Sequence, residues 1–96
     1  VEKRRFIVNT MTRMRYMEAK SAHLNFTAKG ALKTHAELTP WFRHPRMPQM
    51  EKTIIFGHWS ALGLYQDNNV ICLDTGKVWG GLLTALRLDD GILFQV

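Results

Sequence analysis

The middle of the chain reads Ile54-Ile55-Phe56-Gly57-His58-Trp59, three apolar residues followed by Gly-His-Trp. The apolar run predicts a buried strand, and the histidine comes just past its carboxyl end. A histidine there is held rigidly while its ring projects beyond the strand, which suits a metal ligand or an acid–base group. We expect Gly57 to let the backbone turn sharply before it. A single Gly-His pair is more often a structural histidine bonded to a backbone carbonyl, so the motif alone leaves both interpretations open.

The residues after position 51 predict a β-rich half. Segments 53–56, 70–73, 82–88 and 92–96 are rich in apolar and β-branched residues, and each predicts a strand. Residues 67–69 and 89–91 predict turns between them, because Asp, Asn and Gly favour turn conformations. Since Gly91 tolerates a positive φ, the last two strands are expected to form a hairpin. The half is therefore predicted to be an antiparallel β-meander.

The residues before position 51 predict one helix, a short hairpin and a long loop. Apolar residues in segment 2–14 recur at spacings of three and four, which predicts an amphipathic N-terminal helix. Segments 15–17 and 22–26 alternate between apolar and polar residues, as short half-buried strands do. Residues 29–51 hold all three prolines and show no period, so we expect mostly loop. The predicted fold class is α+β.

The length and composition limit the organisation of the chain. We predict that residues 1–96 form a single, incomplete domain, because 96 residues leave room for no more. The start, Val1-Glu2-Lys3, has no initiator Met and no signal-peptide pattern, so we expect it to be the interior of a longer polypeptide. The one cysteine, Cys72, lies in an apolar run and is expected to be buried, which favours a cytoplasmic protein. No apolar run approaches the ~20 residues that span a bilayer, so no membrane association is expected.

The charge of the chain indicates an anionic partner. Its net charge is +5, and Lys3, Arg4, Arg5, Arg13 and Arg15 all fall in the first sixteen residues. Such a block attracts phosphate esters, nucleic acid or acidic lipid head groups. Two arginines could clamp a polyphosphate, although a solvated basic face is an equally good explanation. One alternative function is therefore a basic, β-rich module that binds single-stranded nucleic acid.

Asp74-Thr75-Gly76 follows the predicted strand 70–73 and admits two interpretations. An Asp-Thr-Gly motif occurs in aspartic proteases, where two such carboxylates share a proton. One copy in a small chain could serve that chemistry only in a homodimer. The simpler interpretation is that Asp74 forms a turn and accepts hydrogen bonds from backbone amides.

Five segments taken together resemble one family in their order and spacing. They are 5–15 (Arg-Phe-Ile-Val-Asn-Thr-Met-Thr-Arg-Met-Arg), 38–42 (Leu-Thr-Pro-Trp-Phe), 56–59 (Phe-Gly-His-Trp), 73–76 (Leu-Asp-Thr-Gly), and 79–81 with 83–87 (Trp-Gly-Gly and Leu-Thr-Ala-Leu-Arg). The chain is similar to the carboxy-terminal part of the bacterial symmetrical diadenosine tetraphosphatases, which are calcineurin-like metallophosphoesterases. The resemblance covers nearly the whole chain and is weakest at residues 17–33 and 63–69.

The resemblance implies a fold, a reaction and roles for several residues. The fold would be part of a β-sandwich flanked by helices, in an enzyme that holds two divalent metal ions, usually manganese. Such enzymes hydrolyse diadenosine tetraphosphate at its centre to two molecules of ADP. By analogy His58 is a ligand to one metal ion. The substrate-binding residues would be Arg13 and Arg15 on polyphosphate oxygens, Trp41 or Phe42 on an adenine face, and Asp74 in the same pocket.

The chain departs from this family in what it lacks. The amino-terminal motifs Gly-Asp-x-His-Gly, Gly-Asp-x-x-(Asp/Ala)-Arg-Gly and Gly-Asn-His-(Asp/Glu), and a further His-Ala-Gly, occur nowhere in the sequence. Those motifs carry the remaining metal ligands and the catalytic residues, so we expect the chain alone to be inactive and to hold no metal ion tightly. The expected partners are the amino-terminal remainder of the same protein and a dinucleoside polyphosphate, rather than nucleic acid. A degraded or regulatory relative that kept the fold without catalysis is a third possibility.

Overall fold

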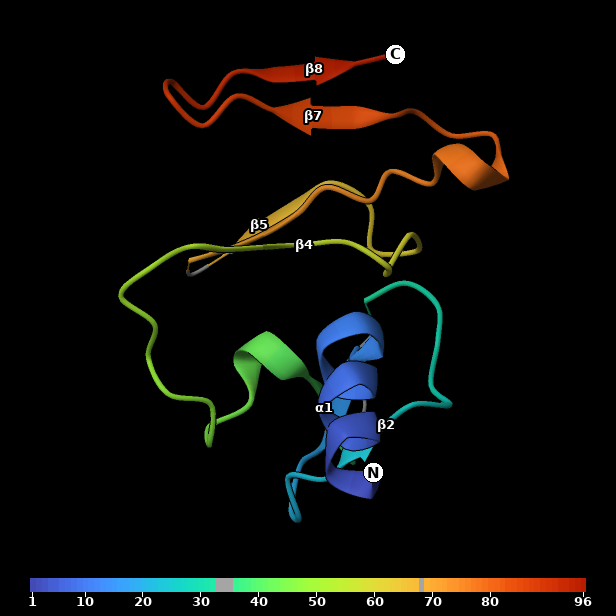
Figure 1. Ribbon diagram of the computed structural model, residues 1–96, viewed down its shortest axis with the longest axis vertical. Coiled ribbons are helices and arrows are strands. Elements are labelled where there is room, and N and C mark those ends of the chain that lie inside the picture. Colours follow the sequence, from blue (N-terminus) through green and yellow to red (C-terminus); the bar gives the residue numbers. More distant parts are fainter. Residues whose placement is uncertain (33–35, 68) are drawn as a thin grey trace. The chain divides into compact units, whose positions relative to one another are not determined.

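The computed structural model describes residues 1–32, 36–67 and 69–96 (Figure 1). It contains one α-helix and several short strands in small sheets within these ranges, so the predicted α+β class is confirmed. The contacts divide the chain into two compact units, Val1–Gln49 and Met50–Val96. None of the helices in the described ranges is long and apolar enough to cross a bilayer.

The amino-terminal unit begins with helix α1, Glu2–Arg13, which confirms the predicted helix to within a residue. The helix ends at Met14, whose extended backbone leads directly into the first strand. Glu2 in the first turn and Arg13 in the last turn both have the sign that the helix dipole favours. The apolar side chains of Phe6, Ile7 and Met11 are all exposed, so this helix buries little within its own unit.

A three-stranded antiparallel sheet with the order β2-β1-β3 follows the helix. Strands β1 (Tyr16–Glu18) and β2 (Leu24–Asn25) form the predicted hairpin. Strand β3 (Leu38–Pro40) and the 3-10 helix Trp41–Arg43 lie inside the segment that we expected to be mostly loop. Pro40 is compatible with a strand because β3 lies at the edge of the sheet and Pro40 is its last residue. Tyr16 and Trp41 are the buried core residues of this unit.

The carboxy-terminal unit contains a mixed sheet with the order β4-β6-β5. Strands β4 (Ile54–Phe56) and β6 (Val70–Cys72) confirm two predicted strands, but they pair in parallel, which differs from the expected antiparallel meander. The unpredicted strand β5 (Tyr65–Asp67) pairs antiparallel with β6. Strand β6 therefore runs beside β4 in the same direction. Of the predicted turn 67–69, Asn68 lies outside the described residues.

The last hairpin is as predicted. Strands β7 (Thr84–Leu86) and β8 (Leu93–Gln95) pair antiparallel, and Figure 1 shows them as the two final arrows of the chain. Gly91 has a φ of 74° in the turn between them, and its amide donates to the carbonyl of Arg87 over 2.8 Å. The guanidinium of Arg87 is bonded to the carboxylate of Asp90 at 2.6 Å, which closes the same turn.

Cys72 is part of the core of the carboxy-terminal unit, together with Trp59 and Val70. Its side chain is fully buried, which confirms the prediction of a structural cysteine. Burial raises the pKa of the Cys72 thiol, the backbone amide of Asp74 opposes that shift, and the nearby Asp74 carboxylate adds to it. The thiol is therefore a poor nucleophile in the folded chain.

Candidate functional site

The carboxyl ends of β4 and β6 lie at the same edge of the sheet, because the two strands are parallel. Phe56 is in register with Cys72, and the amide of Leu73 donates to the carbonyl of Phe56 over 3.0 Å. The segments that follow the two strands are thus neighbours: a Cβ atom added to Gly57 would lie 3.9 Å from Cβ of Asp74. Carboxyl ends of adjacent parallel strands are where binding crevices of α/β sheets form.

His58 is exposed and has a left-handed backbone, with a φ of 71°. A residue with a side chain in this conformation costs about 1–2 kcal/mol relative to the right-handed region. Gly57 does not have a positive φ, so the sharp turn that we expected at the glycine falls on the histidine instead. Such strain concentrates at functional sites, where the surrounding structure holds a side chain in a required direction.

His44 shows what a structural histidine looks like in this protein. It is buried, and its Nε2 lies 3.1 Å from the carbonyl oxygen of Glu18 and 3.3 Å from that of Ala19. Its Nδ1 accepts a hydrogen bond from the amide of Arg46 at 3.1 Å, which assigns the proton to Nε2. The ring of His44 therefore has backbone partners on both nitrogens inside the core, whereas His58 lies at the surface.

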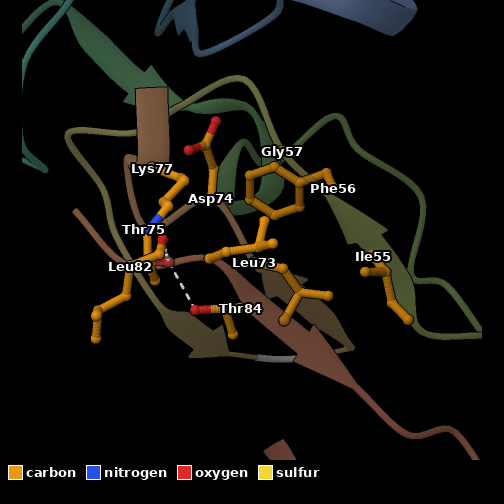
Figure 2. Close-up of a pocket in the computed structure, with 10 residues that line it drawn as sticks. Ile55, Phe56, Gly57, Leu73, Asp74, Thr75, Lys77, Leu82 and Thr84 are labelled. Carbon is orange, nitrogen blue, oxygen red and sulfur yellow. Dashed lines mark hydrogen bonds between the residues drawn. The ribbon is translucent and has the colours of Figure 1, made fainter. Parts of the chain in front are cut away.

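Asp74 and Thr75 are fixed by hydrogen bonds at the end of β6. Oδ1 of Asp74 accepts from the amide of Gly76 at 3.1 Å, as expected for a turn-forming acid. The hydroxyl of Thr75 donates to the carbonyl of Leu82 over 2.5 Å and lies 2.6 Å from the hydroxyl of Thr84. Figure 2 draws this pair of hydroxyls with a dashed line between them. These bonds connect the end of β6 to the start of β7.

An open pocket of about 420 Å³ lies at this edge of the sheet (Figure 2). Its polar lining combines a carboxylate, an ammonium and two hydroxyls, from Asp74, Lys77, Thr75 and Thr84. The rest of its wall is mostly apolar and includes Phe56, Leu73 and the backbone of Gly57. Because the pocket carries one cation and one carboxylate beside an apolar wall, it fits a ligand that has an anionic group, a hydrogen-bond donor and an apolar part.

The other substrate residues proposed from the sequence belong to the amino-terminal unit. The guanidinium of Arg13 lies 5.5 Å from the centre of the Phe26 ring, a cation–π contact at the surface. Arg15 is half-buried, and its carbonyl accepts from the amide of Trp41 at 2.9 Å. Trp41 is only 2% exposed and meets Phe42 edge-on, with 5.4 Å between ring centres. In this structure Trp41 is a core residue, and Phe42 is the more accessible of the two rings.

Within the described ranges, no three His, Cys, Asp or Glu side chains converge closely enough to hold a metal ion. His58 is thus a single candidate metal ligand. Gly57, the residue before it, lies next to Asp74.

Two residues of this region, Lys77 and Trp79, did not emerge from the sequence as site residues. Lys77 lines the pocket, and Trp79 lies on the same short 3-10 helix, Lys77–Trp79. The signal that could have identified them is the glycine on each side, in Gly76-Lys77-Val78-Trp79-Gly80-Gly81. A tryptophan in so tight a turn has few neighbours to bury it.

Three known proteins that are similar to this chain share one description. The chain is 50% identical over 93 residues to the symmetrical bis(5'-nucleosyl)-tetraphosphatase of Nitrosomonas europaea, an alignment that covers 96% of this chain and 34% of that protein. It is 44% identical over 97 residues to the protein of the same description from Chromobacterium violaceum, covering 100% of this chain and 35% of the relative. The corresponding protein of Bordetella pertussis is 50% identical over 93 residues, covering 96% and 33%. No protein-family model matches the chain.

The chain spans about a third of the length of these curated relatives. The matched part is their carboxy-terminal third.

Proposed function

We propose that this chain, a homologue of the carboxy-terminal third of the symmetrical bis(5'-nucleosyl)-tetraphosphatases, acts as that part of a metal-dependent hydrolase. The parent enzyme would cleave diadenosine tetraphosphate to two molecules of ADP. The observation that carries this proposal is the identity of 44 to 50% to such enzymes over nearly the whole chain.

His58 would supply one ligand to a divalent metal ion, with manganese as the expected metal. Two observations support this role: the imidazole is exposed at the carboxyl end of β4, and its backbone is held in a strained conformation. A neutral imidazole nitrogen is a ligand for divalent first-row metal ions, and manganese would also require carboxylate oxygens, which it prefers. The other ligands would come from outside the chain, as expected from the motifs that its sequence lacks.

The pocket beside Gly57 would hold part of the polyphosphate. A pair of divalent metal ions supplies activated water and charge stabilisation for in-line displacement at phosphorus. The ammonium of Lys77 would neutralise phosphate oxygens, while the hydroxyl of Thr75, which donates to the carbonyl of Leu82, holds this wall of the pocket in place. The carboxylate of Asp74 is oriented by the Gly76 amide and would accept a hydrogen bond from a ribose hydroxyl or a water molecule.

Arg13, Arg15 and Phe42 would take part from the amino-terminal unit. The arginines are suited to phosphate because the guanidinium offers a planar fork of donors. Phe42 is half-buried and could offer one ring face to an adenine, whereas the burial of Trp41 favours a structural role for that residue. Of the two alternative stacking residues, Trp41 or Phe42, we therefore retain Phe42.

The remaining two thirds of the parent would cover two of the apolar surfaces that the chain exposes. On α1 these are Phe6, Ile7 and Met11, and on strand β8 they are Leu93 and Phe94. Surfaces of this kind in a small domain mark the position of another chain or segment. The chain spans about a third of the length of these relatives, and the segment that covers these surfaces would belong to the other two thirds.

A chimera tests this proposal. The segment of the Nitrosomonas europaea relative that matches this chain would be replaced by the 96 residues, and ADP release from diadenosine tetraphosphate would be measured with manganese present. We expect the chimera to be active. His58→Ala should reduce kcat by at least about a hundredfold, because a lost metal ligand removes charge stabilisation of several kcal/mol.

The matched control is His23→Ala, since His23 is also an exposed histidine but lies in the amino-terminal unit. This variant should keep the activity of the chimera. A folded chimera that releases no ADP, or one in which His58→Ala and His23→Ala behave alike, would contradict the proposed function.

A further inference from the structure

Trp79 is 81% exposed, although the other two tryptophans of the chain, Trp41 and Trp59, are 2% and 1% exposed. A tryptophan is the largest apolar side chain, and its exposure loses the favourable free energy of burial. Its neighbour Val78 is 84% exposed, so the apolar tip of this turn as a whole faces water.

The turn that carries Trp79 is held rigidly. Gly76 and Gly80 flank the 3-10 helix with φ values of 76° and 93°. The amide of Trp79 donates to the carbonyl of Gly76 over 2.9 Å, and the amide of Gly81 donates to the same carbonyl over 2.9 Å. A Cβ atom at Gly81 would collide with the carbonyl oxygen of Thr75, so the backbone passes too closely there for any other residue. The exposed ring is thus presented by an ordered turn.

This turn also forms part of the pocket at the end of β6. Lys77, two residues before Trp79, lines the pocket together with Thr75, and Figure 2 shows both side chains there. An exposed aromatic ring and an ammonium therefore lie on one turn of three residues. A nucleotide has the complementary pair of features, a flat base and an adjoining anionic phosphate.

We propose that Trp79 is a platform on which one nucleobase of the substrate stacks, while Lys77 neutralises the phosphate attached to that nucleoside. This inference rests on the proposed function, since the substrate named for the relatives carries nucleosides at both ends of a polyphosphate. It gives the tight Gly76–Gly81 turn, with its exposed tryptophan, a purpose that neither the metal site nor the sheet requires.

Tryptophan fluorescence of the 96-residue chain tests the platform directly. Because Trp41 and Trp59 are buried, quenching by acrylamide reports mainly on Trp79. With excitation beyond the adenine absorption, we expect diadenosine tetraphosphate to protect this tryptophan from acrylamide. Inorganic tripolyphosphate, which has the charge but no base, should give no protection. If tripolyphosphate protects equally well, or if neither compound does, the platform is wrong.

Substitutions in the same turn separate the ring from the charge. Trp79→Leu should weaken binding of diadenosine tetraphosphate to the chain by about tenfold or more, which is the usual loss when one stacked base loses its partner. Trp79→Phe keeps a smaller ring and should recover part of the affinity. Val78→Ser, the matched control, changes an equally exposed apolar residue and should leave both protection and affinity unchanged. Equal losses from Val78→Ser and Trp79→Leu would overturn the proposal.

The chimera distinguishes a failure of this inference from a failure of the proposed function. There Trp79→Leu should raise KM for diadenosine tetraphosphate about tenfold with little change in kcat, while His58→Ala lowers kcat. The platform is rejected and the proposed function kept if the chimera is active but Trp79→Leu leaves KM unchanged. The same conclusion holds if Trp79 of an active chimera is shielded from acrylamide when no ligand is present. An inactive chimera together with base-dependent protection of Trp79 in the chain rejects the function and retains the platform.

Discussion

Gly57 and Asp74 lie next to each other across the ends of two parallel strands, with room for a Cβ atom on Gly57 at 3.9 Å from Cβ of Asp74. They are 17 positions apart in the sequence, and the β4–β6 pairing brings them together. The exposed His58, the Asp74 turn and the Lys77 turn all extend from this junction.

The left-handed backbone of His58 predicts an unusual preference for glycine. Both His58→Gly and His58→Ala remove the imidazole, so their difference reports the backbone alone. We expect the glycine variant to be more stable by about 1–2 kcal/mol, as measured by urea unfolding, because only alanine retains the steric cost of a φ of 71°.

The same pair of substitutions at His23 is the control, since His23 is not among the residues with positive φ. There alanine should be more stable than glycine, by about 0.5–1 kcal/mol. Equal stabilities of the two variants at position 58 would mean that the loop is not strained.

Gly81 and Gly57 should respond in opposite ways to alanine. At Gly81 a methyl group would collide with the backbone of Thr75 and Gly76, which cannot move without breaking the turn, so Gly81→Ala should destabilise the chain by about 1–3 kcal/mol. At Gly57 the methyl would make an ordinary contact with Asp74 at 3.9 Å, and Gly57→Ala should be neutral or slightly stabilising. Urea midpoints of the two variants check this, and a Gly57→Ala variant as unstable as Gly81→Ala would refute the packing described for the site.

The β7–β8 hairpin should weaken in acid. The Arg87 guanidinium lowers the pKa of Asp90 below its ordinary value of 3.8, so the folded chain favours the ionised carboxylate. The Arg87–Asp90 pair therefore stabilises the hairpin fully above pH 3.8. This stabilisation is lost as the pH falls through the lower pKa that Asp90 has in the folded chain. The effect should be small because both groups are exposed.

Proton chemical shifts of the hairpin amides between neutral pH and acid would measure this loss. Asp90→Asn keeps an acceptor for the Ile92 amide but removes the charge, so its hairpin should lose that part of the pH dependence. Identical titrations of the unchanged chain and Asp90→Asn would exclude this ion pair as the cause.

Cys72 should resist thiol reagents as long as the chain is folded. Burial raises the pKa of its thiol above the ordinary value of 9.0, so little thiolate forms at mildly alkaline pH, and the side chain is inaccessible as well. Labelling in buffer should be slower than labelling in urea by about tenfold or more. Because the folded-state pKa is the higher one, stability should also decline as the pH rises past 9. Equally fast labelling in buffer and in urea would show that the β6 core is open.

The elements with a clear local pattern could be predicted from the sequence. The spacing of Phe6, Ile7 and Met11 predicts α1, and the turn at Gly91 predicts the β7–β8 hairpin. The strand β3 was missed because its three residues end in Pro40, which is permitted only by its position at a sheet edge. The parallel pairing of β4 with β6 is a long-range choice of partner, and hydrophobic alternation within a strand carries no information about it.

The candidate site could be predicted only in part, for a similar reason. His58 was identified by its position after an apolar strand, whereas its pairing with the Asp74 segment depends on the sheet order. Trp41 was expected near the substrate from the family resemblance, but the β1–β3 pairing places it in the core. Trp79 is the opposite case, since its exposure results from the tight turn between glycines rather than from its own apolar character.

The affinity of the chimera for manganese tests the central role of His58 most directly, because it does not depend on turnover. Titration of Mn²⁺ followed by the electron spin resonance of the free ion would compare the unchanged chimera with His58→Ala and His23→Ala. Loss of a metal ligand should weaken binding at one of the two sites by at least about 10–100-fold in His58→Ala, with no change in His23→Ala. Unchanged manganese affinity in a folded His58→Ala chimera would contradict the assignment of His58 as a metal ligand.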